Sequence, residues 1–468
     1  MKHTYPILGQ ILALLRLGWP IMLAQLLQLS MVVVDNLMIG HLGAVALAGM
    51  ALASIMIHFV FIFAIGVLSA ISPMAAHAFG EQNWPRYFSL ARHGLCLAAG
   101  LTLFCMASFY FAHDLLTLLG QAPETTRVAT RYLQVFTWSM PAQIGFVYLR
   151  QLVEATGKTK VPLYASLMGA LTNAWLDYLL IFGNLGLPRW EIAGAALATT
   201  VASYLMCGTL LLYYLCRIRK RYKLHDHPAP GKWQLRIIGE MLRLGLPLGG
   251  MWVCEVSYFS GAGILMGWIG NLELAAHQIA LNIASFVFMV PLGLSIATTI
   301  RVGHALGEQQ LGQVVSICRA SYGLTLMLML VPALCFATFP HFIVSWYSQD
   351  HDLLTMASRL LMIAGAFQLF DGLQVVGVGI LRGLKDSRVP FFSTMIAFWM
   401  VGIPLSYLMA FKLHWGAYGI WLSMIIGLFT AALLHYLRFR YLLRQLGLKG
   451  PGDGLGPGGC PQGPQNRG

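Results

Sequence analysis

Charged residues are scarce in this chain. Asp, Glu, Lys and Arg together make up 10% of its 468 residues, whereas a soluble domain carries about 25%. Hydrophobic residues make up 58% of the chain, and the mean hydropathy is +0.70. This composition excludes an ordinary soluble domain and predicts an integral membrane protein.

The chain also lacks the ten-residue stretches of alternating apolar and polar residues that are typical of membrane β-barrels. It has long apolar runs separated by short polar breaks, and about 20 helical residues cross the hydrocarbon core. We therefore predict an all-α integral membrane protein. Its twelve predicted transmembrane helices span residues 17–38, 47–72, 92–112, 130–152, 162–183, 192–216, 240–265, 277–300, 316–340, 356–380, 391–412 and 416–440.

Catalytic and metal-binding motifs are absent too. The eight cysteines lie in predicted spans or, for Cys460, in the C-terminal segment, and none has the paired spacing of a zinc site. Neither H-E-x-x-H nor G-x-S-x-G occurs. We expect no enzyme activity and no cofactor.

The net charge of +13 reflects an uneven distribution of basic residues. They concentrate between predicted spans six and seven and after span twelve. By the positive-inside rule this asymmetry places both termini in the cytoplasm, so the basicity indicates topology and no nucleic-acid partner is expected. All but five of the 30 Lys and Arg fall on the cytoplasmic side, and the exceptions are Arg127, Arg131, Arg189, Arg359 and Lys412.

An internal repeat organises the chain. Two six-residue motifs recur with the same offset of 227, and a weaker third match has an offset of 228. Because six spans are an even number, both halves enter the membrane in the same direction, as parallel repeats around an axis along the membrane normal. The matches pair 15–20 with 242–247, 77–82 with 304–309, and 158–162 with 386–390.

The duplication predicts two six-helix lobes around a central cavity, with the substrate site between them near the membrane midplane. The predicted lobes are residues 1–216 and 240–446, joined by a basic cytoplasmic linker at 217–239. Residues 447–468 are rich in Gly and Pro and are expected to form a disordered tail, because they cannot bury a core.

Four carboxylates lie within predicted spans: Asp35, Asp177, Glu255 and Asp371. Placing a charged side chain at the centre of a membrane helix costs about 2.5–3.5 kcal/mol, and nothing structural requires this cost four times. We therefore predict that the four carboxylates mark a cation or proton path. Asp35 and Asp177 are at similar depth, and Asn173 shares a helix face with Asp177. Two carboxylates and an amide facing one cavity can share a proton. The alternatives are a structural hydrogen-bonded pair or a position facing the outer water.

Glu255 and Asp371 are predicted near the midplane of the second lobe. The repeat offset of 227 makes Gln28 the equivalent of Glu255 in the first repeat. Because a glutamine can occupy this position, the fold itself does not require an acid there. Carboxylate and amide oxygens suit Na+, by analogy with other hard cations, and the same carboxylates could pair with an organic cation. We therefore predict a possible Na+ site at Glu255 and Asp371, supported by the amides of Gln278, Asn282 and Gln374.

Aromatic residues could contact a flat organic cation through cation–π interactions. At helical spacing, such residues more often face lipid or the core. The candidates for substrate contact are Trp138, Trp252, Tyr258 and Phe286.

Several motifs together resemble the multidrug and toxic compound extrusion (MATE) family, specifically its bacterial NorM-like branch. The resemblance covers residues 10–445 and includes the duplication. It implies a two-lobed helical bundle in the cytoplasmic (inner) membrane that exports organic cations in exchange for H+ or Na+. The motifs are Ala276–Asn282, Thr299–Gly303, Gly379–Gly383, Val34–Asn36 and Cys254–Val256.

The resemblance also implies site residues. Asp35, Glu255 and Asp371 match acidic positions of the family in the first, seventh and tenth spans, and Asn173 matches an asparagine of the fifth. Asp177 departs from the NorM-like pattern, which has Asn there, and resembles the archaeal DinF-like branch. The chain thus combines acidic positions of both branches, which leaves Na+ and H+ both open as the coupling ion.

We predict a monomeric antiporter that works by alternating access, in which drug and ion compete for the same carboxylates. A flippase for lipid-linked precursors is the main alternative, but it would favour a cationic cavity for phosphate. An intramembrane enzyme is disfavoured by the missing motifs. A channel would more naturally form a symmetric pore than two unlike acidic clusters.

Overall fold

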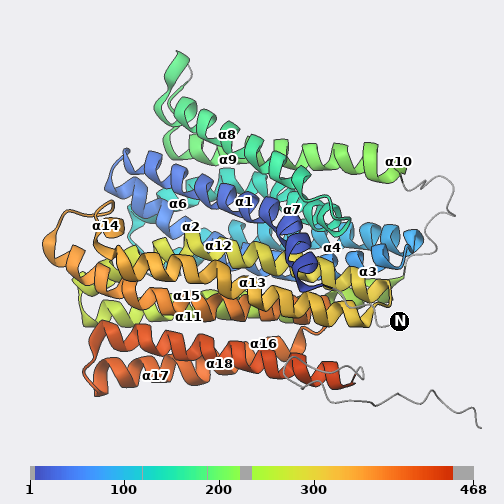
Figure 1. The fold of residues 1–468 in the computed structure, drawn as a ribbon. Coiled ribbons are helices and arrows are strands. Elements are labelled where there is room, and N and C mark those ends of the chain that lie inside the picture. The colour runs from blue at the N-terminus through green and yellow to red at the C-terminus, as the bar shows by residue number, and fades with distance from the viewer. Residues whose placement is uncertain (1–5, 119, 187, 222–233, 446–468) are drawn as a thin grey trace, which may run out of the picture.

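The computed structural model describes residues 6–118, 120–186, 188–221 and 234–445. In these ranges every regular element is helical, and the long helices run roughly along one common direction (Figure 1). The predicted tail and most of the predicted linker lie outside the described residues.

The first half of the chain forms six membrane passages. A short break at Ser69 and Ala70 divides the second, where the Ser69 hydroxyl donates to the Gly66 carbonyl (2.6 Å). The elements are α1 (Ile7–Gly40), α2 (Ala44–Leu68), α3 (Ile71–Gly80), α4 (Trp84–Tyr110), α5 (Ala112–Leu118), α6 (Pro123–Phe136), the 3₁₀ turn η1 (Thr137–Ser139), α7 (Met140–Ala155), α8 (Lys160–Phe182), the 3₁₀ turn η2 (Asn184–Gly186), α9 (Glu191–Tyr213), the π turn η3 (Tyr214–Ile218) and α10 (Arg219–Arg221).

The second half repeats this pattern with longer uninterrupted helices. The eleventh passage of the chain contains two π turns. Pro404 lies in the first turn of the short helix between them. The elements are α11 (Leu235–Ile269), α12 (Asn271–Gly307), α13 (Leu311–Thr338), α14 (Pro340–Val344), α15 (His351–Gly383), α16 (Arg388–Met395), η4 (Ile396–Gly402), α17 (Ile403–Tyr407), η5 (Leu408–Lys412) and α18 (Gly416–Gln445).

Eleven stretches of the described chain are long and apolar enough to cross a membrane. The remaining passage, predicted at 130–152, is built from α6, η1 and α7. It carries Arg127, Arg131, Arg150 and Glu154, which accounts for its low hydropathy. The twelve predicted helical passages are therefore present.

Several helices extend beyond the predicted spans because polar turns continue them past the apolar region. The prediction 277–300, for example, is the middle of α12, which runs from Asn271 to Gly307. Side-chain caps fix two helix starts. Asn83 accepts from the Arg86 amide at the start of α4 (3.1 Å), and Asp350 accepts from the amides of Asp352 and Leu353 at the start of α15.

The first and last described helices share one end of the bundle, which we call the basic end. There α1 begins and α18 ends, and α3, α7, α10, α12 and α15 also end there (Figure 1). The opposite end is called the far end.

Glycines bring the two repeats into backbone contact. A Cβ atom at Gly66 of α2 would lie 2.5 Å from the Cα of Gly249 in α11, and one at Gly293 of α12 would lie 2.8 Å from the Cα of Met22 in α1. These two contacts are equivalent, because Gly293 and Gly249 follow Gly66 and Met22 by the repeat offset of 227. The repeats therefore meet around a pseudo-two-fold axis.

The same symmetry governs the crossing of α3 and α12 at the basic end. A Cβ at Gly80 would collide with the carbonyl oxygen of His304, and a Cβ at Gly307 would collide with that of His77. Both pairs are again related by an offset of 227. The His304 ring Nε2 also lies 2.7 Å from the carbonyl oxygen of Ala155 at the end of α7.

Polar contacts between the repeats reinforce closure at the basic end. Arg301 donates to the Gln10 side chain (2.6 Å). Glu154 and Arg382, which are repeat equivalents with opposite charges, interact electrostatically across the boundary. These contacts and the glycine contacts lie in the basic half of the helices, so the structure is closed between the repeats at the basic end.

Gly307→Val is expected to open this end, because the new side chain would collide with the backbone of α3. Spin labels at Lys158 and Arg388, two exposed residues of different repeats, should report a longer and broader distance distribution by electron–electron double resonance. Gly323→Val is the matched control, since no heavy atom lies within 4 Å of a Cβ there. An unchanged distribution in Gly307→Val would show that the crossing does not hold the repeats together.

Candidate functional site

The predicted acidic residues of the first repeat form one buried cluster near the far end. Asp35 of α1 and Asp177 of α8 each lie five residues before the end of their helix, a depth of about 7.5 Å along the helix axis. Asn173, one turn earlier on α8, is fully buried, as is Asp177, and Asp35 is 5% exposed. The structure therefore brings these three predicted residues together.

A threonine that the sequence analysis did not single out connects the cluster. The Thr199 hydroxyl of α9 lies 3.3 Å from Asp35 Oδ2, and Asn173 Nδ2 donates to it (3.4 Å). The hydroxyl also lies 3.0 Å from the carbonyl oxygen of Ala195. A hydroxyl has one proton, so Thr199 can donate either to Asp35 or to its own helix. Because donation to its own helix is common for threonine, the second contact of Thr199 leaves no pattern in the sequence.

Most oxygens of this cluster have no hydrogen-bond donor. Both carboxyl oxygens of Asp177, Oδ1 of Asp35 and Oδ1 of Asn173 are buried without a partner. The carboxyl groups of Asp35 and Asp177 are within hydrogen-bonding reach of each other. Tyr132 interacts electrostatically with both of them. Two carboxyl groups can bond to each other only if one is protonated.

A proton or a small cation would satisfy these oxygens. Unpartnered buried polar atoms cost free energy, and buried charges are stable only when they are paired. Within the described residues, neither Asp35 nor Asp177 forms an ion pair with a basic side chain. The first cluster thus presents buried, unpartnered oxygens that a bound proton or cation would satisfy.

The second repeat contains a separate acidic cluster near the middle of its helices. Glu255 of α11 is 6% exposed and Asp371 of α15 is 3% exposed, and the two carboxylates interact electrostatically. Gln374, one turn after Asp371, is fully buried. Asp371 Oδ1 and both polar atoms of the Gln374 side chain lack a hydrogen-bond partner. This cluster also presents unsatisfied oxygens without a basic partner among the described residues.

The two predicted amides on α12 lie at exposed positions. Gln278 and Asn282 are exposed, and no hydrogen bond links either to Glu255 or Asp371 within the described chain. They lie in the far half of α12, whereas its basic half packs against the first repeat. This exposure suits a polar surface facing water, and the expectation of direct support for the carboxylates stays a prediction.

The aromatic candidates lie in different environments. Tyr258 is fully buried and stacks on Phe398 with ring centroids 4.6 Å apart, which favours a packing role. Trp252 packs against core residues of both repeats, and its buried Nε1 has no partner. Trp138 is 65% exposed, and Phe286 is half-buried.

A buried ion pair in α7 was also missed. Arg150 Nε donates to Glu154 (2.7 Å), and Arg150 Nη1 donates to Gln25 of α1 (2.6 Å). Arg150 also reaches Gln28 at 3.5 Å, the residue equivalent to Glu255. In the sequence this ion pair is indicated by a basic residue, Arg150, inside the predicted span 130–152. Its partner Glu154 lies just beyond that span.

The two clusters hold two carboxylates each, and the described ranges contain no group of three or more His, Cys, Asp or Glu that could hold a metal ion. Carboxylate and amide oxygens form both sites. Such hard ligands suit a proton or an alkali cation better than a transition metal.

Comparisons with known proteins agree with this architecture. The family model named MatE matches the chain twice, at residues 20–179 and 247–408, which are the two repeats. The chain is 37% identical to a probable multidrug resistance protein NorM of Agrobacterium fabrum, over 92% of this chain and 94% of the relative. It is 33% identical to the multidrug resistance protein MdtK of Yersinia pseudotuberculosis, over 92% and 96%.

Solved structures share the fold at low sequence identity. An outward-facing MATE-family transporter of the MOP superfamily has a TM-score of 0.85 at 20% identity, covering 94% of this chain and 97% of that one. The eukaryotic MATE transporter AtDTX14 has a TM-score of 0.80 at 21% identity, covering 92% and 96%. These likenesses show a bundle of twelve transmembrane helices in two repeats. From the family model and the NorM relatives together, the chain belongs to the multidrug and toxic compound extrusion (MATE) family.

Proposed function

We propose that this protein is a secondary antiporter that exports organic cations in exchange for Na+ or H+ by alternating access. The observation that carries the proposal is the pair of buried acidic clusters, one in each repeat. Asp35 Oδ1, both carboxyl oxygens of Asp177 and Asp371 Oδ1 lack a hydrogen-bond partner, and none of the four carboxylates has a basic partner among the described residues. The names of the NorM and MdtK relatives, which describe multidrug resistance, support the substrate class.

The charge of the clusters selects the ligand. Four buried carboxylates that have no basic partner within the described part of the chain attract cations and repel anions, so a phosphate-bearing lipid precursor is a poor substrate. The flippase alternative therefore has no supporting observation. We propose no catalytic activity, because the relatives are transporters and the clusters hold no nucleophile paired with a base.

The two clusters differ in what they offer. In the first, two carboxyl groups within reach of each other can share a proton. In the second, two carboxylates and the free amide of Gln374 provide oxygen ligands for Na+. We propose that protons bind mainly to the Asp35–Asp177 cluster, and that Na+ or the organic cation binds at Glu255 and Asp371.

The available driving force limits how many ions must be exchanged for each organic cation. Exchange of one H+ for one monovalent cation moves no net charge, so only the pH difference drives it, at about 1.4 kcal/mol per pH unit. A second coupling ion adds the membrane potential, about 2.3 kcal/mol per charge per 100 mV. Two separate clusters allow two coupling ions to be carried per cycle.

The orientation follows from charge. The positive-inside rule places the basic end in the cytoplasm, with both termini there and the far end outside. The protein is then a multi-pass monomer of the cytoplasmic (inner) membrane. In this orientation the repeats are closed toward the cytoplasm, as an outward-facing state requires.

The double variant Glu255→Gln/Asp371→Asn should lose export of a fluorescent cation such as ethidium from cells. Losing a buried charged partner costs about 2–5 kcal/mol of binding, which corresponds to cation binding weaker by about thirtyfold or more. Glu124→Gln/Asp352→Asn makes the same chemical changes at exposed positions and should export normally. Wild-type export by the first variant, at equal expression, would rule out the assigned role.

Thr199→Val should impair proton coupling while leaving the fold intact, because it removes the hydroxyl beside Asp35 and keeps the side-chain shape. Drug-driven proton release from reconstituted vesicles should fall several-fold. Thr209→Val is the control on the same helix, since the Thr209 hydroxyl donates to the Leu205 carbonyl of that helix (2.8 Å). Equal proton release in both variants would remove Thr199 from the site.

The division of labour between clusters predicts separable ion dependence. In vesicles, Asp35→Asn/Asp177→Asn should abolish transport driven by a pH gradient, and Glu255→Gln/Asp371→Asn should abolish transport driven by a Na+ gradient. If the first variant lost only the Na+-driven component, the assignment of ions to clusters would be reversed.

A further inference from the structure

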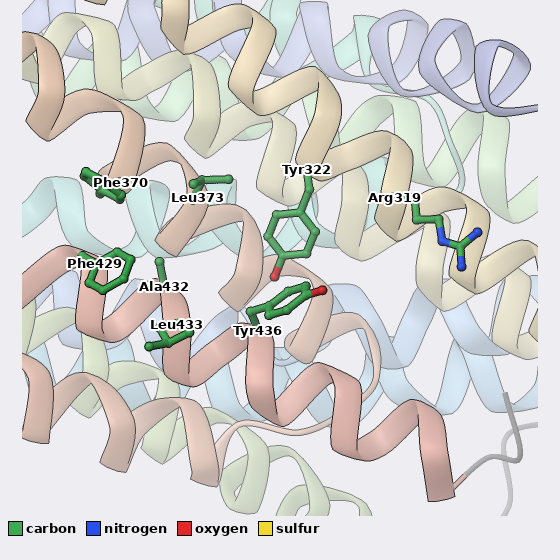
Figure 2. Close-up of a pocket in the computed structure, with 8 residues that line it drawn as sticks. All are labelled: Arg319, Tyr322, Phe370, Leu373, Phe429, Ala432, Leu433 and Tyr436. Carbon is green, nitrogen blue, oxygen red and sulfur yellow. The ribbon is translucent and has the colours of Figure 1, made fainter. Parts of the chain in front are cut away.

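A groove on the second repeat lies apart from both acidic clusters. It has a volume of about 380 Å³ and runs between α13 and α18 over the surface of α15 (Figure 2). Its lining is mostly apolar, with polar side chains gathered at one end. The lining residues are Arg319, Tyr322, Phe370, Leu373, Phe429, Ala432, Leu433 and Tyr436.

The groove opens on a lipid-facing surface. The helices on either side of it expose large apolar side chains, among them Met327 and Leu330 on α13 and Phe429 and Leu437 on α18. A soluble protein would bury such side chains, whereas a membrane helix directs them to lipid. The groove is therefore accessible from the bilayer.

The polar and apolar ends of the groove lie at different depths. Arg319 is eight residues from the start of α13 at the basic end, about 12 Å along the axis. Phe429 is sixteen residues from the basic end of α18, about 24 Å, which is near the membrane midplane. Figure 2 shows Arg319 at one end of the groove, Phe370 and Phe429 at the other, and the two tyrosines between them. The groove thus follows the path of one lipid leaflet.

The polar end offers donors to an anion. Below this end the Tyr322 ring meets the Tyr436 ring edge-on at 5.9 Å, with the Tyr322 hydroxyl buried. The Arg319 guanidinium is always charged and suits phosphate oxygens. Arg440 lies one turn beyond Tyr436 on the same face of α18, which adds a second positive charge toward the membrane surface.

We propose that this groove binds an anionic glycerophospholipid of the cytoplasmic leaflet. Its phosphate is held by Arg319, and one acyl chain lies along Phe370, Phe429 and Leu433. Basic pockets between transmembrane helices on the cytoplasmic side are suited to anionic headgroups. The choice of leaflet rests on the proposed orientation, but lipid binding itself does not depend on the transport function.

The lipid would contact the helix that carries the second acidic cluster. Phe370 and Leu373 line the groove, and their neighbours Asp371 and Gln374 are one residue further along α15, rotated by about 100°. A bound acyl chain therefore packs against one face of α15 while an adjacent face presents the ion ligands.

Native mass spectrometry of the full-length protein with phosphatidylglycerol or phosphatidylcholine tests the proposal. Wild type should prefer phosphatidylglycerol, and Arg319→Gln should bind it about fivefold more weakly, the effect of about 1 kcal/mol per basic residue. Arg444→Gln, which removes an exposed charge from the end of α18, should change the affinity less than Arg319→Gln.

Filling the apolar end tests the acyl-chain site without touching the headgroup site. Leu433→Trp should weaken binding of both lipids, whereas Leu437→Trp, at an exposed position on the same helix outside the lining, should not. Since both residues are exposed, neither change should prevent folding. Equal lipid binding by the two tryptophan variants, or unchanged lipid preference in Arg319→Gln, would overturn the proposal. Binding of ethidium that Leu433→Trp abolishes would instead identify the groove as a drug site.

Discussion

Direct backbone contact between the two repeats is the constraint on which this structure depends. Gly66 and Gly293 hold equivalent positions and remove the side chains that would otherwise separate α2 from α11 and α1 from α12. In a bilayer, where lipid is as apolar as the helices, small residues allow the close packing that drives association. Because these contacts lie in the basic half, the repeats can separate at one end without losing the contacts at the other. The fold is thus prepared for rocking of one repeat against the other.

Function resides in the differences between the repeats. The fold is nearly symmetric, but Glu255 stands where the first repeat has Gln28, and Asp35 stands where the second has Ala262. Glu154 and Arg382 occupy equivalent positions with opposite charges and attract each other at the basic end. A duplicated scaffold thereby carries two unlike acidic clusters and one complementary contact across its axis.

The sequence was sufficient to predict the helical class, the number of passages and the duplication. Hydropathy and motif offsets can be read from the sequence without knowing which residues are in contact. It also predicted the pairing of Asp35 with Asp177 and of Glu255 with Asp371, since a buried carboxylate in a span is conspicuous. It missed Thr199, because a threonine that bonds its own helix leaves no pattern. The passage built from α6 and α7 was harder to bound, because Arg150 and Glu154 form an ion pair inside it. Periodicity also could not tell that Tyr258 stacks in the core while Gln278 and Asn282 are exposed, since that depends on which helix faces meet.

The central claim is that buried carboxylates exchange small and large cations across a pair of rocking repeats. The most direct test is simultaneous measurement of ethidium uptake and counter-ion efflux in vesicles containing the purified protein. We predict that ethidium uptake requires an opposing Na+ or H+ gradient and is accompanied by efflux of that ion in a fixed ratio. Both movements should be lost when Asp35, Asp177, Glu255 and Asp371 are replaced by their amides. Ethidium uptake that proceeds at the same rate without either gradient, or in the fully amidated variant, would contradict the account.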